Sequence, residues 1–577
     1  MQLNWKIKHP ESDAVKLLSR QLNCHIVIAA ILVNRNIMAP ETAHAFLNAS
    51  LADLRSPFLL KDIDIATQRI ADAISRREKI LLFGDYDVDG VTGTSILLDF
   101  LQRADADVSY YLPHRLKEGY SLQHAHITDY VIPRGFNLII TTDCGASSHK
   151  AVAAAQTAGV DVIITDHHIV GDTLPPAFAV INPQRKDCDA GFGHLAGVGV
   201  SFYLLIALRK YLRDNGFWTD KPEPNLKDYC DLVALGTVAD IVPLVGENRI
   251  LAGAGIELIN LKKRIGVKAL AEASGLKNQP ADAEDIAFKL APRINAAGRM
   301  DHAGMAVELF TTRNMTTAHK IATKLSDLND KRRKAEQAIL TEIEDYLEAA
   351  PDVLKNKSIV LSDLHSPRQW NAGILGIVAS RLVKKYFRPV VLIAFQNGAG
   401  KGSARSIPGF HLYNGLAACA DVLKAFGGHS MAAGLKISTT QLALFREAFD
   451  TAVRQKTAPD DFIPILQIDH ELDFDDIDAP LLDGLETLKP FGQGNPEPLF
   501  MARDITVVSS KIVGRNHRKM VLSQCGQYSQ KRFAAIQFNL DDCSNLPDTF
   551  DQIAFRLRWN YWNNTKTMQI QIEAVKV

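Results

Sequence analysis

The sequence predicts an α/β protein whose first large domain is built on a mostly parallel sheet. Short apolar runs at residues 80–83, 138–140 and 162–164 each end in polar residues, and helix-like stretches separate them. This alternation is typical of βαβ units in an open parallel sheet. Two more observations complete the fold class. Residues 316–350 have a continuous, charged helical pattern, and residues 463–577 alternate β-branched with polar side chains, which indicates a small antiparallel β-barrel.

Five segments are expected along the chain. They are an N-terminal helical segment at 1–60, a catalytic α/β domain at 61–315, a long connector helix at 316–350, a second α/β domain at 351–459 and a C-terminal β-barrel at 460–577. We expect the N-terminal segment to form a lid or brace over the catalytic domain. Pro351 ends the connector helix, because proline cannot continue the backbone hydrogen bonds of a helix.

The composition is that of an ordinary globular protein, with 47% hydrophobic and 23% charged residues. The formal net charge is zero, so binding to nucleic acid would need a local basic surface. Seven cysteines without a Cys-x-x-Cys spacing indicate neither a zinc ribbon nor a disulfide framework. The apolar run at 25–33 is too short to cross a bilayer and predicts a buried helix. We therefore expect a cytoplasmic protein that does not enter a membrane.

Acidic and histidine side chains follow the apolar runs. In chain order they are Asp85, Asp87, Asp89, Asp143, Asp166, His167, His168 and Asp240. The run at 232–237, which precedes Asp240, is interpreted as a fourth strand. Ligands bind beyond the carboxyl ends of parallel strands, so these side chains should converge on one edge of the sheet. So many carboxylates repel one another unless divalent cations compensate their charge, and the pattern therefore predicts a metal site.

The acidic residues allow two other interpretations. The spacing of Asp85, Asp87, Asp89 and Gly90 imitates an EF-hand loop, but the twelfth position is Ile96 instead of a bidentate Glu, and a strand precedes the loop instead of a helix. Alternatively, each acid caps a helix, as Asp at a strand-to-helix turn often does. Four such turns in strand order, one with paired histidines, favour the metal site.

These motifs resemble the DHH phosphoesterase superfamily, named for Asp166-His167-His168, and within it the RecJ single-strand-specific exonucleases. The resemblance covers nearly the whole chain. Its further marks lie at residues 113–115, 119–120, 195–199, 291–299, 373–381, 402–406, 427–429 and 490–496. One departure is visible: the family usually carries His after Trp370, where this chain has Asn371. The resemblance implies an OB-fold for the C-terminal barrel.

Oxygen-rich ligands with imidazole suit Mn²⁺ or Mg²⁺ better than Zn²⁺, and two such cations serve phosphodiester cleavage. By the family pattern, Asp87 and Asp89 bind different cations, and Asp143 bridges the two. His167 and Asp240 complete the second site. Asp85 either binds directly or orients a ligand or water.

Six more residues are candidates for substrate contacts, besides His168. We expect His168 to contact the scissile phosphate or brace a ligand; the alternative is a histidine packed under its loop. By resemblance, Arg299 lies near the scissile group, although read alone it is a surface residue. The others are Arg115, Ser403 and Arg405 for a 5′-phosphate pocket, Tyr120 for base stacking or simple turn packing, and His429 for the substrate backbone. Basic runs at 331–334 and 515–519 are surface charges; the second run is also a candidate for tracking single strands or docking an acidic partner tail.

The resemblance implies a metal-dependent 5′→3′ exonuclease that hydrolyses single-stranded DNA to 5′-mononucleotides in DNA recombination and repair. It suggests single-strand-binding protein and a RecQ-type helicase as partners, and we expect a monomer. Two alternatives are a small-substrate DHH phosphoesterase, acting on oligonucleotides or cyclic dinucleotides, and a non-catalytic DHH scaffold in replication. The C-terminal barrel argues against the first, and the complete set of ligand residues argues against the second.

Overall fold

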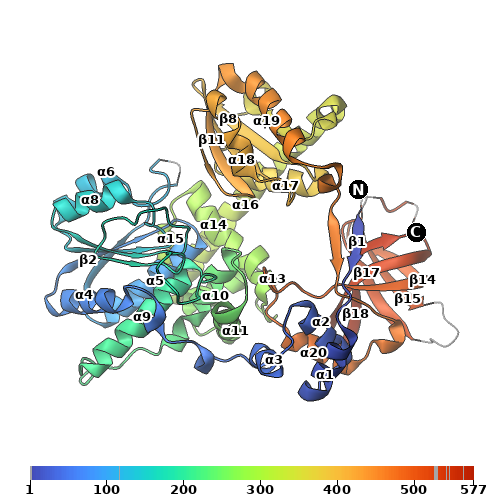
Figure 1. Ribbon diagram of the computed structural model, residues 1–577, viewed down its shortest axis with the longest axis horizontal. Helices are drawn as coiled ribbons and strands as arrows, with labels where there is room; N and C mark the ends of the chain where they lie inside the picture. Colours follow the sequence, from blue (N-terminus) through green and yellow to red (C-terminus); the bar gives the residue numbers. More distant parts are fainter. Residues whose placement is uncertain (1–2, 116, 525–530, 541, 545, 563–564) are drawn as a thin grey trace.

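The computed structural model describes residues 3–577 except 116, 525–530, 541, 545, 563 and 564. Figure 1 shows a first α/β domain in blue to green, a second in yellow to orange and a red barrel domain. The long helix α16 (Met315–Ala349) leads from the first domain to the second, as the charged helical pattern predicts. In the described part of the chain, no helix combines the length and apolar character that a membrane span requires.

The first domain is built on a five-stranded sheet with the order β3-β2-β4-β5-β6. Its strands are β2 (Lys79–Gly84), β3 (Asp107–Tyr111), β4 (Leu138–Thr142), β5 (Asp161–Thr165) and β6 (Ala179–Ile181). Every neighbouring pair is parallel, which confirms the predicted parallel sheet. All of β4 is buried, as expected when helices cover both faces of a parallel sheet.

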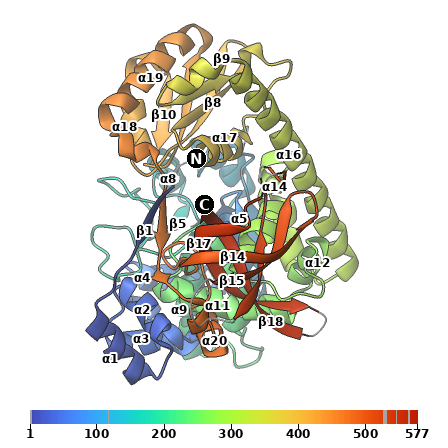
Figure 2. The same ribbon diagram turned by 90° about the vertical axis from the view of Figure 1, so that its right-hand side faces the viewer.

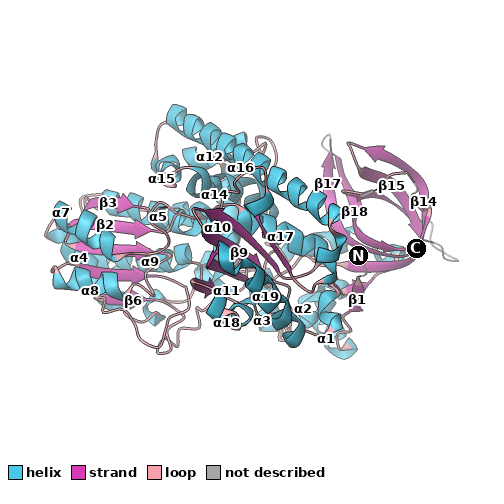
Figure 3. Cartoon of the chain, turned by 90° about the horizontal axis from the view of Figure 1, so that it is seen from above, coloured by secondary structure: helices cyan, strands magenta, loops and turns pink. Residues whose placement is uncertain are grey.

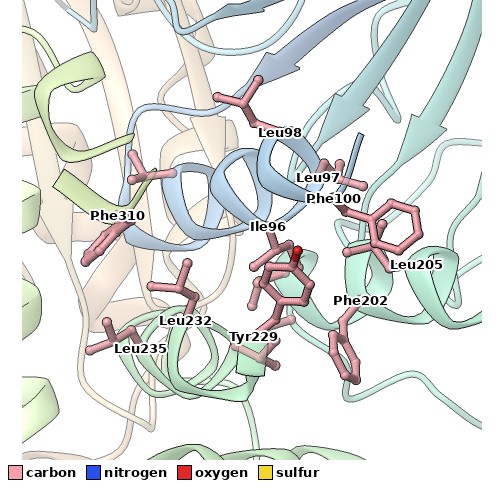
Figure 4. Close-up of a cluster of buried hydrophobic side chains, with 14 of the residues drawn as sticks. Ile96, Leu97, Leu98, Phe100, Phe202, Leu205, Tyr229, Leu232, Leu235 and Phe310 are labelled. Atoms are coloured by element: carbon pink, nitrogen blue, oxygen red, sulfur yellow. The ribbon is translucent and has the colours of Figure 1, made fainter. Parts of the chain in front are cut away.

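Helices pack on both faces of this sheet and form two separate cores. The larger core lies between the sheet and helices α4 (Ile63–Ser75), α5 (Val88–Arg103), α9 (Gly197–Asp214) and α10 (Cys230–Ala239). Figure 4 shows its centre, where Ile96 and Phe100 lie near Phe202 and Leu232. This packing holds the amino-terminal ends of α5 and α9 against the carboxyl edge of the sheet.

The run at 232–237 is a helix, so the prediction of a fourth strand there is wrong. It belongs to α10 (Cys230–Ala239), and Asp240 follows the helix as its C-cap. Residues 230–238 are all buried, so the run is apolar on every side. Periodicity alone cannot distinguish a fully buried helix from a buried strand.

The second α/β domain contains a mixed sheet with the order β10-β11-β9-β8-β7. Its strands are β7 (Ile359–Ser362), β8 (Val390–Gln396), β9 (Ala399–Arg405), β10 (Ala425–Gly428) and β11 (Ala432–Ser438). Strands β7 and β8 pair in parallel, and the other neighbouring pairs are antiparallel. Helices α17 (Leu375–Tyr386) and α19 (Leu442–Lys456) pack on the sheet.

The C-terminal domain is a closed barrel, as the alternating pattern predicts, but it is not purely antiparallel, because β16 and β18 pair in parallel. Its strands are β14 (Phe500–Val513), β15 (His517–Gln524), β16 (Arg532–Gln537), β17 (Thr549–Trp562) and β18 (Thr565–Lys576). Pairing of β14 with β17 closes the barrel, which is visible from above in Figure 3. Helix α20 (Ala479–Thr487) packs against it.

The N-terminal helices pack with the barrel domain and not as a lid over the catalytic domain, whereas the expected brace is present, because Arg55 of the same N-terminal segment pairs with Glu247 at 2.5 Å. Helices α1 (Ser12–Leu22), α2 (Ile26–Asn34) and α3 (Pro40–Leu47) share one hydrophobic core with α20 and the barrel strands. Figure 2 shows these blue helices beside the red barrel. The first strand, β1 (Asn4–Ile7), pairs in parallel with β12 (Ile465–Ile468), which connects the second domain to the barrel.

The remaining α-helices and one short strand complete these domains. They are α6 (His124–His126), α7 (Ile132–Arg134), α8 (His149–Thr157), α11 (Gly246–Leu261), α12 (Ile265–Ala273), α13 (Ala283–Asp285), α14 (Ala291–Met300), α15 (Gly304–Thr311), α18 (Leu412–Ala417) and β13 (His470–Glu471).

The shared core predicts which domain becomes less stable when a residue of the N-terminal helices is substituted. Ile31 is fully buried on α2, so Ile31→Ala should lower the free energy of unfolding by about 2–5 kcal/mol. Hydrogen exchange measured by mass spectrometry should become faster in strands β14–β18 and stay unchanged in β2–β5. Leu17, on α1, is 58% exposed, and Leu17→Ala serves as the control. Faster exchange confined to the first α/β domain would contradict the assignment.

Candidate metal centre

Five carboxylates and two imidazoles converge at the carboxyl edge of the first sheet, as the sequence predicts. They form three groups whose potential ligand atoms lie within 4.8 Å of one another: Asp85, Asp87 and Asp143; Asp89, His167 and Asp240; and Asp143, His167 and His168. Two of these groups share Asp143 and two share His167. The result is one continuous cluster instead of separate surface acids.

Backbone N–H groups hold two of the carboxylates in place. Asp87 is the N-cap of α5, and its Oδ1 accepts hydrogen bonds from the N–H groups of Asp89 at 3.0 Å and Gly90 at 3.2 Å. The Asp89 carboxylate accepts from the N–H groups of Gly197 at 2.6 Å and Val198 at 2.7 Å, at the start of α9. Helix N-termini favour negative charge, so both positions stabilise carboxylates. Helix capping and metal binding are therefore compatible at Asp87.

A glycine makes room for the centre of the cluster. A Cβ atom added to Gly197 would lie 2.6 Å from the Cβ of Asp143, closer than real Cβ contacts allow. Asp143 itself has a φ of 61°, in the left-handed region that Asp and Asn tolerate better than most residues. The tight turn after β4 thus presents the Asp143 carboxylate directly to α9.

Asp166 anchors the loops around the cluster, a role that its motif alone did not assign. Its Oδ2 accepts from the N–H of Ala146 at 2.8 Å. Its Oδ1 accepts from the N–H groups of His167 and His168 and lies 2.7 Å from the His168 Nδ1. The available signal for this role was its place at the head of the histidine pair, directly after a buried strand.

Three buried atoms in the cluster have no hydrogen-bond partner among the described residues: Asp85 Oδ1, Asp143 Oδ1 and His167 Nε2. The His167 Nε2 lies 3.2 Å from Asp143 Oδ1, 3.5 Å from Asp240 Oδ2 and 3.8 Å from Asp89 Oδ2. Buried polar atoms are normally satisfied. Oxygen and imidazole donors facing one another without hydrogen bonds are the donor set that fits hard divalent cations.

Burial and mutual repulsion shift the pKa values of the carboxyl groups upward. Burial, followed by repulsion from Asp87, raises the pKa of Asp89 to about 7. Burial and then the Asp89 charge raise the pKa of Asp240 to about 9. The pKa values of Asp85 and Asp143 also lie well above normal, mainly because of burial. The positive charges of His168 and Arg115 lower the pKa of Asp85 only in part, so additional positive charge would favour full ionisation of the cluster.

His168 stands at the open side of the cluster. Its side chain is 40% exposed, so it is not packed under its loop. Burial lowers its pKa, but the hydrogen bond to Asp166 outweighs this and raises the pKa to about 9. The Tyr120 hydroxyl lies 3.2 Å from His168 Nδ1 and 3.3 Å from the Asp143 carbonyl oxygen. Tyr120 is 38% exposed and therefore presents part of its ring beside the cluster.

Arginines gather next to the carboxylates. Burial, and then repulsion from Arg115, Arg332 and Arg405, lowers the pKa of Arg299 to about 9. Its Nη1 donates to the Gly373 carbonyl at 2.8 Å, whereas its buried Nε has no partner in the described chain. The Arg115 guanidinium lies 4.9 Å from the centre of the Tyr86 ring, a contact that no sequence motif indicated. These arginines form a cationic cluster able to bind an anion.

Ser403 and Arg405, on β9, point their side chains at the start of α17. A Cβ atom on Gly376 would be 2.9 Å from Ser403 Oγ and 2.8 Å from an Arg405 guanidinium nitrogen. Asn371, the departure from the family pattern, accepts from the N–H of Gly373 at 2.8 Å and so shapes the loop that enters α17. The side chains and the helix N-terminus together favour an anion here.

Three other basic residues in the motifs and basic runs make contacts of their own. His429 lies on an exposed turn after β10, and its backbone N–H donates to Ala432. Arg518 is 2% exposed and donates to the Pro547 carbonyl at 2.7 Å, so it cannot track a DNA strand from the surface. Arg332, in the run at 331–334, pairs with Glu336 at 3.1 Å.

Comparison with known proteins places the chain in a family. Models of three domains match: the DHH family, N-terminal domain, at residues 79–237, the DHHA1 domain at 356–455 and the RecJ OB domain at 468–574. The chain is 37% identical to the single-stranded-DNA-specific exonuclease RecJ of Salmonella typhimurium over 531 residues, which cover 89% of this chain and 90% of that protein. The chain belongs to the RecJ family. It is 35% identical to RecJ of Bacillus subtilis over 580 residues, which cover all of this chain and 71% of that protein.

A solved structure agrees with this family assignment. The chain superimposes on RecJ from Thermus thermophilus, crystallised in complex with Mn²⁺, with a TM-score of 0.83 and 29% identity; the match covers 100% of this chain and 80% of that one. A second structure of that protein, in complex with Mg²⁺, matches with a TM-score of 0.77. The RecJ matches favour neither a small-substrate phosphoesterase nor a non-catalytic scaffold.

The raised pKa values predict how the metal-free protein responds to pH. An Asp with an ordinary pKa of about 3.9 when unfolded and a higher one when folded costs stability once it ionises. The free energy of unfolding of EDTA-treated protein should therefore fall as the pH rises from about 4 toward 9, because Asp89 and Asp240 have pKa values of about 7 and about 9. Urea unfolding at a series of pH values, with and without Mn²⁺, measures this. A rise in metal-free stability across the window would contradict it.

Neutralising one carboxylate should raise the stability of the metal-free protein and weaken its metal binding. Asp143→Asn removes a repelled charge and keeps a residue that tolerates the positive φ, so metal-free protein should melt a few degrees higher, about 1 kcal/mol more stable. The rise in melting temperature on adding Mn²⁺ should shrink or vanish. Asp129, exposed on the outer surface, offers the control Asp129→Asn. A metal-free variant that is less stable than wild type would refute the repulsion argument.

Proposed function

We infer that this protein is a metal-dependent exonuclease that hydrolyses single-stranded DNA. The observation that carries this function is the cluster of unpaired ligand atoms of Asp85, Asp143 and His167, next to an arginine cluster. Membership in the RecJ family and the barrel matched by the RecJ OB domain support single-stranded DNA as the substrate.

The chain offers ligands for two divalent cations, Mn²⁺ or Mg²⁺. Asp85, Asp87 and Asp143 would hold one cation, and Asp89, His167 and Asp240 the other, with Asp143 shared between them. This keeps Asp87 and Asp89 on different cations and makes Asp85 a direct ligand. When bound, such a pair neutralises charge on the phosphate, lowers the pKa of a water nucleophile and stabilises the leaving oxygen.

The protein's own side chains supply the remaining contacts. With a pKa raised to about 9 by Asp166, against the effect of burial, His168 is protonated at neutral pH and donates a hydrogen bond to a non-bridging phosphate oxygen. Burial, with the nearby Asp166 and Asp143 charges, raises the pKa of Tyr120. Tyr120 therefore stays neutral, and its partly exposed ring supports a terminal base by stacking. The unpaired Nε of Arg299 is a donor for the scissile phosphate.

The anion pocket of Arg115, Ser403 and Arg405 supports a 5′→3′ polarity. A terminal 5′ phosphate seated there would deliver the first linkage to the metal centre, and cleavage would release 5′-mononucleotides. His429 would contact the strand backbone farther along. By family resemblance, we propose a role in DNA recombination and repair, single-strand-binding protein and a RecQ-type helicase as partners, and action as a monomer.

Polarity is tested directly with labelled oligonucleotides. Single strands labelled at the 3′ end and carrying a 5′ phosphate should shorten from the 5′ end in Mn²⁺ or Mg²⁺, and EDTA should stop the reaction. Strands with a bulky 5′ block should be degraded slowly, whereas a 3′ block should have little effect. Equal digestion from the 3′ end would contradict the proposed polarity, and undiminished digestion in EDTA would contradict metal dependence.

Arg405 offers a sharper test of the phosphate pocket. Arg405→Ala removes a charged hydrogen-bond donor, which should lower kcat/KM on 5′-phosphorylated strands by about 10-fold or more. On strands with a 5′ hydroxyl the loss should be much smaller. Arg405→Lys keeps the charge without the planar fork and should be intermediate. An equal loss on both substrates would show that Arg405 does not recognise the terminal phosphate.

A further inference from the structure

The turn at residues 490–496 of the barrel domain contacts the segment that follows Asp240. The Leu244 N–H donates a hydrogen bond to the Gln493 carbonyl at 2.7 Å. A Cβ atom on Gly492 would lie 2.7 Å from the Leu244 Cδ1, and one on Gly494 would lie 3.1 Å from the Pro243 Cβ. A larger residue at either glycine would therefore require the Leu244 side chain or Pro243 to shift, and Gly494 also has a φ of 73° that other residues rarely adopt.

The turn itself is held rigidly from the other side. Asn495 is fully buried, and its Nδ2 donates to the carbonyl oxygens of Leu488 at 2.9 Å and Pro490 at 2.7 Å. Its Oδ1 accepts from Arg35 Nη1, and Arg35 Nη2 donates to the Pro496 carbonyl at 2.7 Å. Arg35 is the C-cap of α2, so the N-terminal helices fix the shape of the turn.

A second contact secures the same joint between the domains. Arg249, on α11 of the first domain, is 5% exposed. It donates to the carbonyl oxygens of Thr487 at 3.1 Å and Leu488 at 2.9 Å, at the end of α20, and to that of Phe46 at 3.1 Å. One buried guanidinium thus binds three backbone carbonyls across the interface between the domains. This fixes the position of the turn against residues 243–244.

The segment between Asp240 and the turn contains a strained residue. Ile241 has a φ of 62°, a left-handed conformation that a β-branched residue adopts only when its surroundings impose it. Its side chain is 72% exposed, so side-chain packing does not impose the conformation. The chain on either side must therefore impose the conformation. Before Ile241 lies α10, with Asp240 as its C-cap. After Ile241, Asn248 donates to the Pro243 carbonyl at 3.0 Å and the Leu244 N–H donates to the Gln493 carbonyl, so residues 243–244 are held in place.

We propose that the turn at residues 490–496 is a positioning element for the metal ligand Asp240. By fixing Pro243 and Leu244 it maintains the strained bend at Ile241, which directs the Asp240 carboxylate toward His167 and Asp89. Docking of the barrel domain is thereby coupled to the affinity of one cation site. This inference rests on the proposed function in one respect, namely that Asp240 holds a cation.

Gly492→Ala tests the coupling at its narrowest contact. Its new methyl group would press on Leu244 without changing a metal ligand, and Mn²⁺ binding is measured by isothermal titration calorimetry and electron paramagnetic resonance. One of the two ions should bind about 10-fold more weakly, at the lower end of what supporting partners of metal ligands cost. The Mn²⁺ concentration for half-maximal cleavage should rise equally, while kcat at saturating Mn²⁺ largely recovers.

Gly253→Ala is the matched control. Gly253 lies on α11 at the same joint, but its added Cβ would be 4.0 Å from the Pro490 Cδ, an ordinary contact. Its Mn²⁺ affinities should equal those of the wild type. Leu244→Ala removes the side chain on the other side of this contact. It should also weaken the binding of one Mn²⁺ ion, and it serves as the test if Gly492→Ala fails to fold.

The outcomes separate this inference from the proposed function. Wild-type Mn²⁺ affinities in folded Gly492→Ala and Leu244→Ala proteins would overturn the inference and leave the proposed function intact. The same would follow from equal weakening of both ions, because the turn is argued to act on Asp240 alone. Absence of Mn²⁺ binding by the wild-type protein would overturn the proposed function itself.

Discussion

Repulsion among carboxylates buried at one sheet edge is the constraint on which the rest of the structure depends. Burial disfavours their ionised forms, and each charge raises the pKa of its neighbours, as at Asp89 and Asp240. Hydrogen bonds from backbone N–H groups at the starts of α5 and α9 offset part of this repulsion. His168 and Arg115 offset a further part, and divalent cations would supply the remaining positive charge.

The parallel sheet explains why so much of the site was predictable from the sequence. Strand ends in a parallel sheet share one edge, so three short apolar runs were enough to bring Asp87, Asp143 and His167 together in the prediction. Asp240 was placed correctly although its element was not, because a fully buried helix and a buried strand have the same apolar signature. The barrel was predictable because its strands alternate faces.

Features that depend on contacts between segments far apart in the sequence have no local sequence pattern and could not be predicted. The α2 helix is apolar on all sides, which predicted burial but not against which domain. Arg518 lies in a basic run typical of a surface, yet it is buried against Pro547 because the pleat of β15 turns it inward. The joint of Arg35, Arg249 and Asn495 joins residues that are hundreds of positions apart. Such contacts follow from the docking of domains, which local periodicity does not encode.

The proposed cleavage and the proposed effect of the turn at residues 490–496 on Asp240 both depend on the carboxylate cluster holding two ions. Anomalous diffraction at the manganese edge, from crystals soaked in Mn²⁺, tests this most directly. Two peaks about 3.5–4 Å apart are expected, one among Asp85, Asp87 and Asp143 and the other among Asp89, His167 and Asp240. A single peak, or none within reach of these side chains, would contradict the account.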